Sequence, residues 1–289
     1  MSEFTFTAIG THWHIQYNSL YENNDSLITA IKDRIELFEQ NYSRFRGDSF
    51  VGQIAQQEGV YKLPEDAERM LNLYRRLYDI SGGKVTPLIG SVLVDAGYDA
   101  EYSLIPKNVV HQAELWDDVM EYNVPFLTTK CPVQLDFGGL GKGYIIDIIA
   151  DMFREAHIYD FSINAGGDIA YSSSEDAVFR VGLEDPNDNT KVIGVAEILN
   201  KSIAGSAGNR RAWSTYHHII DPTSTTSPQH IAAVWVVADT TLFADGLTTA
   251  LFFMEPDELS QHFSFEYAIV YADKSITHSP NFPGSFFTT

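Results

Sequence analysis

The chain has 289 residues, 44% of them hydrophobic and 13% aromatic, which is enough apolar material for a substantial core. Its 39 acidic and 19 basic residues give a formal net charge of −20 at pH 7, which disfavours nucleic acid and anionic membrane surfaces as partners. A single cysteine, Cys131, excludes an internal disulfide and a cysteine-based zinc cluster. We expect one domain over residues 1–289.

The sequence has no apolar run long enough to span a bilayer and no basic start followed by an apolar stretch. We therefore expect no transmembrane segment and a cytoplasmic protein as given. If a leader has been removed from the chain, a periplasmic or extracytoplasmic location is expected instead.

Alternating and helical apolar spacings predict the secondary structure in chain order. Strands are expected at 4–8, 12–17, 133–135, 160–164, 177–183, 191–199, 232–238 and 267–272, the last being the final strand. Helices are expected at 25–40, from Pro64 to about 80, after the loop at 136–144, and at 242–254. A less regular stretch covers 87–125. Strands and helices mixed in this order indicate an α+β fold rather than a regular βαβ array.

The loop from Asp136 to Tyr144 contains four glycines and one lysine, Lys142, between the strand-like run and a dense helical pattern. Glycines let a backbone approach phosphate closely, and a helix N-terminus offers free N–H groups. The loop matches neither a Walker A motif nor a Rossmann fingerprint. It predicts a phosphate cradle, with a glycine turn that merely caps a buried helix as the alternative.

Three other clusters have both a functional and a structural explanation. Asp168 follows two glycines, a pattern that also fits a hairpin turn. The pair Arg210 and Arg211 suits phosphate or carboxylate, or balances surface acids. His218 follows another histidine and precedes an Asp-Pro turn, where it suits a general base, a ligand contact or a core residue. Zinc is disfavoured there because no third ligand stands at the usual spacing.

Asp245 and Thr249 are four residues apart at the start of a predicted helix, so their oxygens lie on one face, one turn apart. A carboxylate and a hydroxyl, with a carbonyl added, form a hard-oxygen set that suits Mg²⁺. The alternative is an acidic residue that stabilises the helix dipole.

The order of these motifs resembles the FAD:protein FMN transferase family, the ApbE-type flavin transferases. The matching blocks are Gly10-Thr11, Ser43-Arg44-Phe45-Arg46 with Ser49, Ser81-Gly82-Gly83 with Pro87 and Gly90, the loop from Asp136 to Asp147, Asn164 to Asp168, Glu184-Asp185-Pro186, Ser206 with Arg210, His218 to Pro222, and Ala244 to Leu251. The resemblance implies one compact α+β unit of the T-fold type. It also implies Mg²⁺-dependent transfer of FMN from FAD, its substrate, to a threonine or serine hydroxyl of an acceptor flavoprotein, with release of AMP.

The resemblance also implies roles for single residues. Asp245 and Thr249 match metal-binding side chains, and Gly139 and Thr248 match positions that lend backbone carbonyls to the metal. Dinucleotide contacts are implied for Ile9, Phe45, Lys84, Val85, Thr86, Asp136, Lys142 and His218. His218 is also the candidate base for the acceptor hydroxyl, so the implied catalytic residues are His218 and Asp245.

Several positions depart from the family pattern. Ile9 stands where methionine is common, Phe45 replaces a tyrosine, and Val85-Thr86 replaces a Phe-Asp pair. Phe45 keeps a ring face for adenine stacking but lacks the hydroxyl. The changes cluster around the dinucleotide, which favours altered recognition over lost chemistry. An FAD pyrophosphatase that releases FMN and AMP, and a non-catalytic flavin-binding protein, are the alternatives.

Overall fold

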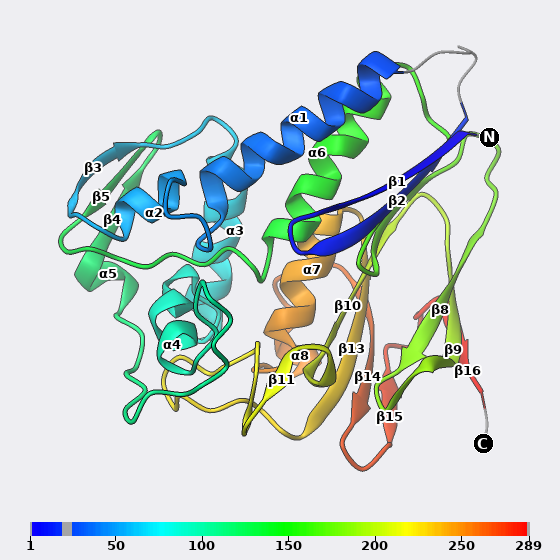
Figure 1. The fold of residues 1–289 in the computed structure, drawn as a ribbon. Helices are drawn as coiled ribbons and strands as arrows, with labels where there is room; N and C mark the ends of the chain where they lie inside the picture. The colour runs from blue at the N-terminus through cyan, green and yellow to red at the C-terminus, as the bar shows by residue number, and fades with distance from the viewer. Residues whose placement is uncertain (1, 19–24, 288–289) are drawn as a thin grey trace.

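The computed structural model describes residues 2–18 and 25–287 and is built around an eight-stranded antiparallel sheet (Figure 1). The strands lie in the order β1 (Ser2–Ala8), β2 (Thr11–Tyr17), β6 (Phe161–Ala165), β7 (Asp168–Ser172), β10 (Ser202–Ala207), β13 (Ile231–Ala238), β14 (Glu266–Tyr271) and β15 (Ile276–His278). Nearly every residue of β13 is buried, so apolar side chains leave this central strand on both faces. The sheet is therefore covered on both sides.

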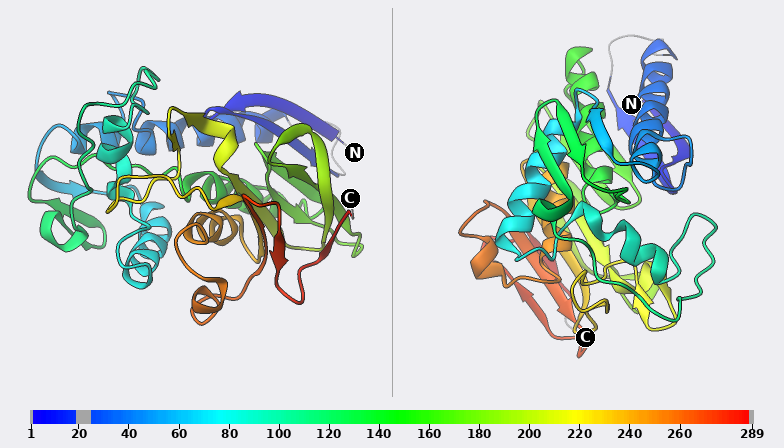
Figure 2. Two further views of the ribbon diagram at one scale, coloured as in Figure 1. Left: turned by 90° about the horizontal axis from the view of Figure 1, so that it is seen from below. Right: turned by 90° about the vertical axis from the view of Figure 1, so that its left-hand side faces the viewer.

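One face of the sheet is covered by a helical layer, which the views of Figures 1 and 2 show around the middle of the molecule. Its helices are α1 (Asp25–Tyr42), α3 (Ala67–Ile80), α6 (Gly141–Glu155) and α7 (Thr241–Ala250). α6 packs against β6 and β7, and α7 packs against β10 and β13. In α1 the buried side chains are Ile31, Ile35, Phe38 and Tyr42, which recur every three or four residues and face the core.

The junction between α6 and α7 is fixed by backbone hydrogen bonds to a buried acid. The carboxylate of Asp147 accepts hydrogen bonds from the backbone N–H groups of Thr241 and Leu242, at 2.8 and 2.9 Å. These N–H groups belong to the first turn of α7 and have no partner within that helix. The Thr240 side chain caps the same turn by accepting from the N–H of Phe243. The position of α7, and of the polar residues on it, therefore depends on α6.

The opposite face of the sheet is covered by a smaller sheet of β8 (Phe179–Asp185), β9 (Asp188–Ile198) and β16 (Gly284–Phe286), in the order β16-β9-β8. Alternation along the strands creates this second core. On β10, Ala204 faces the helical layer, whereas Ile203 packs with Leu183 and Trp235 under the smaller sheet. β8 is an edge strand, because within residues 2–18 and 25–287 it pairs with β9 alone.

The remaining elements are short. They are a sheet ordered β3 (Gly59–Lys62), β5 (Phe126–Thr129) and β4 (Met120–Asn123), the ribbon β11 (Ala212–Trp213) and β12 (Tyr216–His217), and the helices α2 (Phe50–Ile54), η1 (Pro87–Ile89), α4 (Gly90–Asp95), α5 (Trp116–Val119), η2 (Gly208–Arg211) and α8 (Pro256–Leu259). α4 shares a small core with the ribbon, in which Val92, Tyr98 and Trp213 are buried.

The predicted α+β class is confirmed, and the predicted long helices and most of the predicted strands are present. The strand expected at 133–135 is wrong. Val133 and Leu135 are buried, which explains the strand-like pattern, but the segment is extended without a place in any sheet. Its hydrogen bonds are isolated ones, such as that from the N–H of Asp136 to the carbonyl of Pro87 at 2.7 Å.

Three other predictions need correction. The stretch at 87–125 contains short helices, the helix expected to reach 254 ends at 250, and β15 and β16 follow the strand expected to be last. Short β3, β5, β7 and β10 were not predicted, because their polar or small residues hide the alternation. Among the described residues, no helix has the length and apolar character to cross a membrane.

Candidate active site

Most of the predicted site residues line one cavity of about 190 Å³. Those present are Phe45, Lys84, Val85, Thr86, Asp136, Gly139, Lys142, His218, Asp245 and Thr249. Ile9 lies instead in an adjoining cavity of about 270 Å³, which shares Phe45, Asp136 and Lys142 with the first. Thr248 is fully buried behind the wall. Residues from every third of the chain thus meet in one place.

Oxygen atoms from α7 and from the glycine loop converge on one side of the cavity. Asp245 and Thr249 lie one turn apart on α7, as predicted, and the Thr249 hydroxyl lies 3.4 Å from the carbonyl oxygen of Gly139. The buried hydroxyl of Thr248 donates to the carbonyl oxygen of Asp245 at 2.7 Å and lies 2.8 Å from the Ser206 hydroxyl. A carboxylate, a hydroxyl and a carbonyl are hard oxygen donors, and this set fits Mg²⁺.

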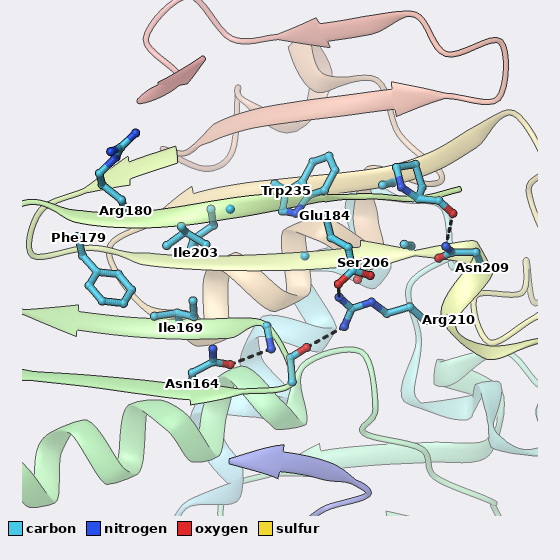
Figure 3. Close-up of a pocket in the computed structure, with 18 residues that line it drawn as sticks. Asn164, Ile169, Phe179, Arg180, Glu184, Ile203, Ser206, Asn209, Arg210 and Trp235 are labelled. Atoms are coloured by element: carbon cyan, nitrogen blue, oxygen red, sulfur yellow. Dashed lines mark hydrogen bonds and ion pairs between the residues drawn. The ribbon is translucent and has the colours of Figure 1, made fainter. Parts of the chain in front are cut away.

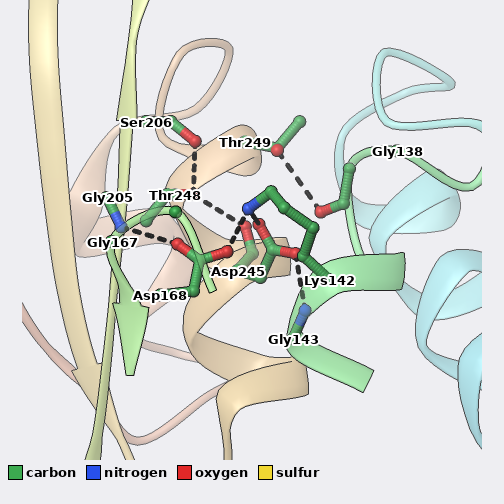
Figure 4. Close-up of polar contacts among 12 residues, drawn as sticks. Gly138, Lys142, Gly143, Gly167, Asp168, Gly205, Ser206, Asp245, Thr248 and Thr249 are labelled. Atoms are coloured by element: carbon green, nitrogen blue, oxygen red, sulfur yellow. Dashed lines mark hydrogen bonds and ion pairs between the residues drawn. The ribbon is translucent and has the colours of Figure 1, made fainter. Parts of the chain in front are cut away.

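Lys142 lies between two buried carboxylates, as Figure 4 shows. Its ammonium group forms an ion pair with Asp168 and lies 3.5 Å from an Asp245 oxygen. Burial alone would lower the pKa of Lys142, but the attraction of Asp168 and Asp245 raises it above its ordinary value. The lysine therefore stays charged. With both acids ionised, the three side chains carry one net negative charge, which a bound cation would balance.

Asp245 is 2% exposed, and burial raises its pKa above its ordinary value, a rise that Lys142 opposes and Asp168 reinforces. Its second oxygen accepts a hydrogen bond from the N–H of Gly143 at 2.9 Å. A Cβ on Gly143 would lie 2.2 Å from the carbonyl oxygen of Thr241, so only glycine allows this approach of α6 to α7. Among the described residues, no three His, Cys, Asp or Glu side chains gather as a metal cluster. A cation here would thus depend on the Thr249 and carbonyl oxygens as well as on Asp245.

Asp136 lies at the start of the glycine loop and is paired within the protein. One of its oxygens accepts from the N–H of Gly138 at 2.7 Å, and the other forms an ion pair with the Nε of Arg44. The Arg44 side chain is only 3% exposed. Asp136 therefore shapes the loop at the same time as it lines both cavities.

The ring of Phe45 already contacts three side chains, those of Arg44, Tyr98 and Tyr102. The Arg44 guanidinium carbon lies 4.2 Å from the ring centroid, and the ring of Tyr102 stacks on it at 5.1 Å. Phe45 was predicted to offer a face for adenine. In the structure, an adenine that stacks there would compete with Tyr102, which is half exposed.

His218 is surrounded by positive groups. Burial is the largest cause that lowers its pKa, and together with the charges of Arg211, His217 and Lys142 it brings the pKa to about 3. Its Nδ1 atom is buried and has no hydrogen-bond partner within residues 2–18 and 25–287. The imidazole is therefore neutral at pH 7, with a ring nitrogen free for a ligand. By contrast, His217 is a core residue whose Nε2 lies 2.8 Å from the carbonyl oxygen of Pro228.

The sequence did not assign roles to Asp168, Arg44 or Ser206, although it marked their motifs. Asp168 does follow a hairpin turn, between β6 and β7, in which Gly166 and Gly167 have φ values of 63° and 103°. The hairpin turn and a role in the site are thus compatible, because the hairpin places the Asp168 carboxylate next to the ammonium group of Lys142. For Asp168, the available sequence signal was the pair of glycines that precedes it. For Arg44 and Ser206, no periodic pattern in the sequence indicated a role in the site.

Known proteins share both the sequence pattern and the fold. The model of the ApbE family matches residues 9–268. FAD:protein FMN transferase of Haemophilus influenzae is 22% identical over 277 residues, covering 87% of this chain and 80% of the relative. That of Vibrio cholerae is 23% identical over 277 residues, covering 86% and 79%.

Solved structures agree. The ApbE protein of Thermotoga maritima superposes with a TM-score of 0.84 at 20% identity, covering 96% of this chain and 97% of that chain. The flavin transferase ApbE of Vibrio cholerae superposes with a TM-score of 0.82 at 20% identity, covering 96% of both. A family match over nearly the whole length, on the same fold, leaves one conclusion: this chain belongs to the ApbE family.

Proposed function

We propose that the protein transfers FMN from FAD to a threonine or serine hydroxyl of an acceptor flavoprotein, in a reaction that needs Mg²⁺. The observation that carries the proposal is the convergence of Asp245, Thr249 and the Gly139 carbonyl beside a neutral, unpartnered histidine. The names of the relatives support the same reaction. The reaction forms a bond between the acceptor oxygen and the flavin-side phosphorus, breaks the bridging P–O bond, and releases AMP with that electron pair.

The protein's own groups would hold the pyrophosphate and the cation. Asp245, Thr249 and the carbonyls of Gly139 and Thr248 would bind Mg²⁺, which would neutralise charge on the phosphate oxygens. Lys142 adds a positive charge that Asp168 keeps in place. Asp136, Lys84, Val85, Thr86, Phe45 and Ile9 would contact the rest of the dinucleotide along the two joined cavities.

His218 would take the proton of the acceptor hydroxyl. A base with a pKa near 3 is weak; burial is the main cause of that value, and the positive charges around the ring add to it. Bound pyrophosphate brings negative charge that counters Arg211 and Lys142, and this raises the pKa of the imidazole. The Nδ1 atom has no partner among the described residues, so no hydrogen bond at that nitrogen fixes where the ring carries its proton, and the ring lines the cavity that would hold the acceptor hydroxyl.

The experiment incubates the protein with FAD, MgCl₂ and a library of extended peptides, each carrying one threonine. The expected result is a fluorescent peptide whose mass rises by FMN less water, with one AMP released per label. Matched peptides with valine in place of threonine, and samples containing EDTA, should stay unlabelled. FMN and AMP without labelled peptide would replace the proposal with hydrolysis, and unchanged FAD would replace it with binding alone.

A further inference from the structure

A separate cavity of about 300 Å³ lies between β8 and the outer face of β7, β10 and β13 (Figure 3). Its apolar walls come from the second core, where Ile169, Ile203 and Trp235 face Phe179 and Val181 of β8. The volume far exceeds what one structural water needs. The packing between the two sheets is therefore incomplete at this end.

This cavity reaches the candidate active site. Gly166, Gly205, Ser206, Ala207 and Arg210 line both this cavity and the one that holds Asp245 and His218. All but Arg210 are small, so the wall between the two spaces is thin. Ser206 marks the boundary, because its hydroxyl lies 2.8 Å from that of Thr248, next to the proposed metal ligands.

Polar groups of the cavity lie next to the wall that it shares with the candidate active site. There Arg210 forms an ion pair with Glu184 at 2.8 Å and donates to the carbonyl oxygen of Gly166 at 3.1 Å. Phe179 and Arg180 lie on the opposite side of the residues drawn in Figure 3. The lining residues therefore extend from the shared wall along β8.

Trp235 supplies a hydrogen-bond donor that the protein does not use. The side chain is about nine-tenths buried and lines the cavity, but its indole N–H donates to no residue that the structure describes. The indole N–H groups of Trp13 and Trp213, in contrast, donate to backbone carbonyls at 3.1 and 2.7 Å. Because the Trp235 nitrogen is not among the fully buried polar atoms of the described residues, its N–H is open to the cavity, where a ligand that presents a carbonyl can accept from it.

We propose that this cavity binds an extended segment of the acceptor polypeptide, with a backbone carbonyl on the Trp235 N–H and the acceptor hydroxyl reaching over Ser206. The inference rests on the proposed transfer reaction. A polypeptide suits the site because β8 is an edge strand, whose free backbone groups can pair with an added strand. The dinucleotide does not need this space, because two other cavities already join around Asp136 and Lys142.

The test uses whichever peptide the wild-type protein labels in the library experiment above. Val181→Trp fills the cavity, and Val192→Trp is its matched control, because Val192 lies on neighbouring β9, is 48% exposed and does not line the cavity. Trp235→Phe removes the N–H and keeps an aromatic ring. The measurements are KM and kcat for the peptide, Kd for FAD from flavin fluorescence, and Ki of the threonine-to-valine peptide as a non-reacting competitor.

Val181→Trp is expected to raise the peptide KM and the competitor Ki about tenfold or more, and Trp235→Phe about fivefold, the effect of one hydrogen bond. Kd for FAD should change less than about twofold, and Val192→Trp should match the wild type. An unchanged peptide KM in both Val181→Trp and Trp235→Phe would overturn the assignment. A rise in the Kd for FAD that parallels the rise in peptide KM would also overturn it, because it would mean that the dinucleotide binds in this cavity. Should Val181→Trp not fold, Trp235→Phe decides alone. If the wild-type protein labels no peptide, the transfer reaction itself fails, and the acceptor site with it.

Discussion

At the junction of α6 and α7 the two backbones touch, whereas between β8 and the large sheet a cavity of about 300 Å³ remains. At the junction, Asp147 and Asp245 each accept from backbone N–H groups of the other helix. At the cavity, the indole N–H of Trp235 has no such bond within the described residues. The carboxylate proposed for chemistry is thus fixed by backbone contacts, whereas the surface proposed for recognition is incompletely packed.

The greatest loss of stability and activity is expected from adding a side chain at Gly143, where the backbones of α6 and α7 touch. Gly143→Ala would place its Cβ 2.2 Å from the Thr241 carbonyl oxygen and 2.8 Å from the Asp245 Cβ, so α6 and α7 must separate. We expect a loss of about 3 kcal/mol or more in the free energy of unfolding, with FAD cleavage abolished. Urea denaturation and FAD turnover measure the two effects.

Two glycines serve as controls for that variant. At Gly141, on the same helix, a Cβ would meet the Phe38 ring at an ordinary 3.7 Å. Gly182 lines the cavity between β8 and the large sheet. A Cβ there would meet only the side chain of Val192, at 2.9 Å, and this exposed side chain is free to shift. Both alanine variants should stay near wild-type stability. If either one lost as much as Gly143→Ala, the contrast between the two regions would be wrong.

Removing the charge of Asp245 tests the proposed cation site. Asp245→Asn keeps an oxygen that can accept from Gly143 but lacks the negative charge for Mg²⁺. We expect Mg²⁺-dependent FAD cleavage to fall about 10²-fold or more, with the cation requirement shifted to higher concentration. Asp239→Asn is the control, since Asp239 is exposed and pairs with Lys201. Full activity of Asp245→Asn at low Mg²⁺ would show that the metal lies elsewhere.

Asp147 tests how strongly the junction depends on its backbone bonds. Asp147→Ala leaves the buried N–H groups of Thr241 and Leu242 unpaired, and we expect it to cost about 2–4 kcal/mol of unfolding free energy. Asp147→Asn should cost less, because its amide oxygen still accepts one bond. Thermal and urea unfolding compare the two. Equal losses would indicate that the charge, not the hydrogen bonding, holds α7.

The pH dependence of stability tests the environment of His218. Its pKa falls from the ordinary 6.5 to about 3 in the folded protein. As the pH drops below about 6.5 the unfolded chain therefore takes up this proton first, and stability decreases. Relative to His218→Gln, the wild type should lose about 2 kcal/mol between pH 7 and pH 5. Parallel stability curves for the two proteins over this range would contradict the buried, neutral histidine.

The fold class, the long helices and the family resemblance could all be predicted from the sequence alone. Ile31, Ile35 and Phe38 recur at helical spacing, and such periodicity reports burial without reference to distant residues. The spacing of Asp245 and Thr249 in the sequence also predicted that they share a helix face, because four residues make about one turn of an α-helix.

The contacts of those side chains, in contrast, follow from the packing of distant segments and are visible only in the three-dimensional structure. The pairing of Lys142 with Asp168 and Asp245, and of Arg44 with Asp136, joins residues up to 103 positions apart. Local spacing carries no information on such contacts. The same limit explains the wrong strand prediction at 133–135. The buried residues of this segment alternate as in a strand, but the segment pairs with no strand that the structure describes. This limit also explains why the sequence did not predict the cavity between β8 and the large sheet. A space between two sheets depends on how distant segments pack, which cannot be read from any single segment.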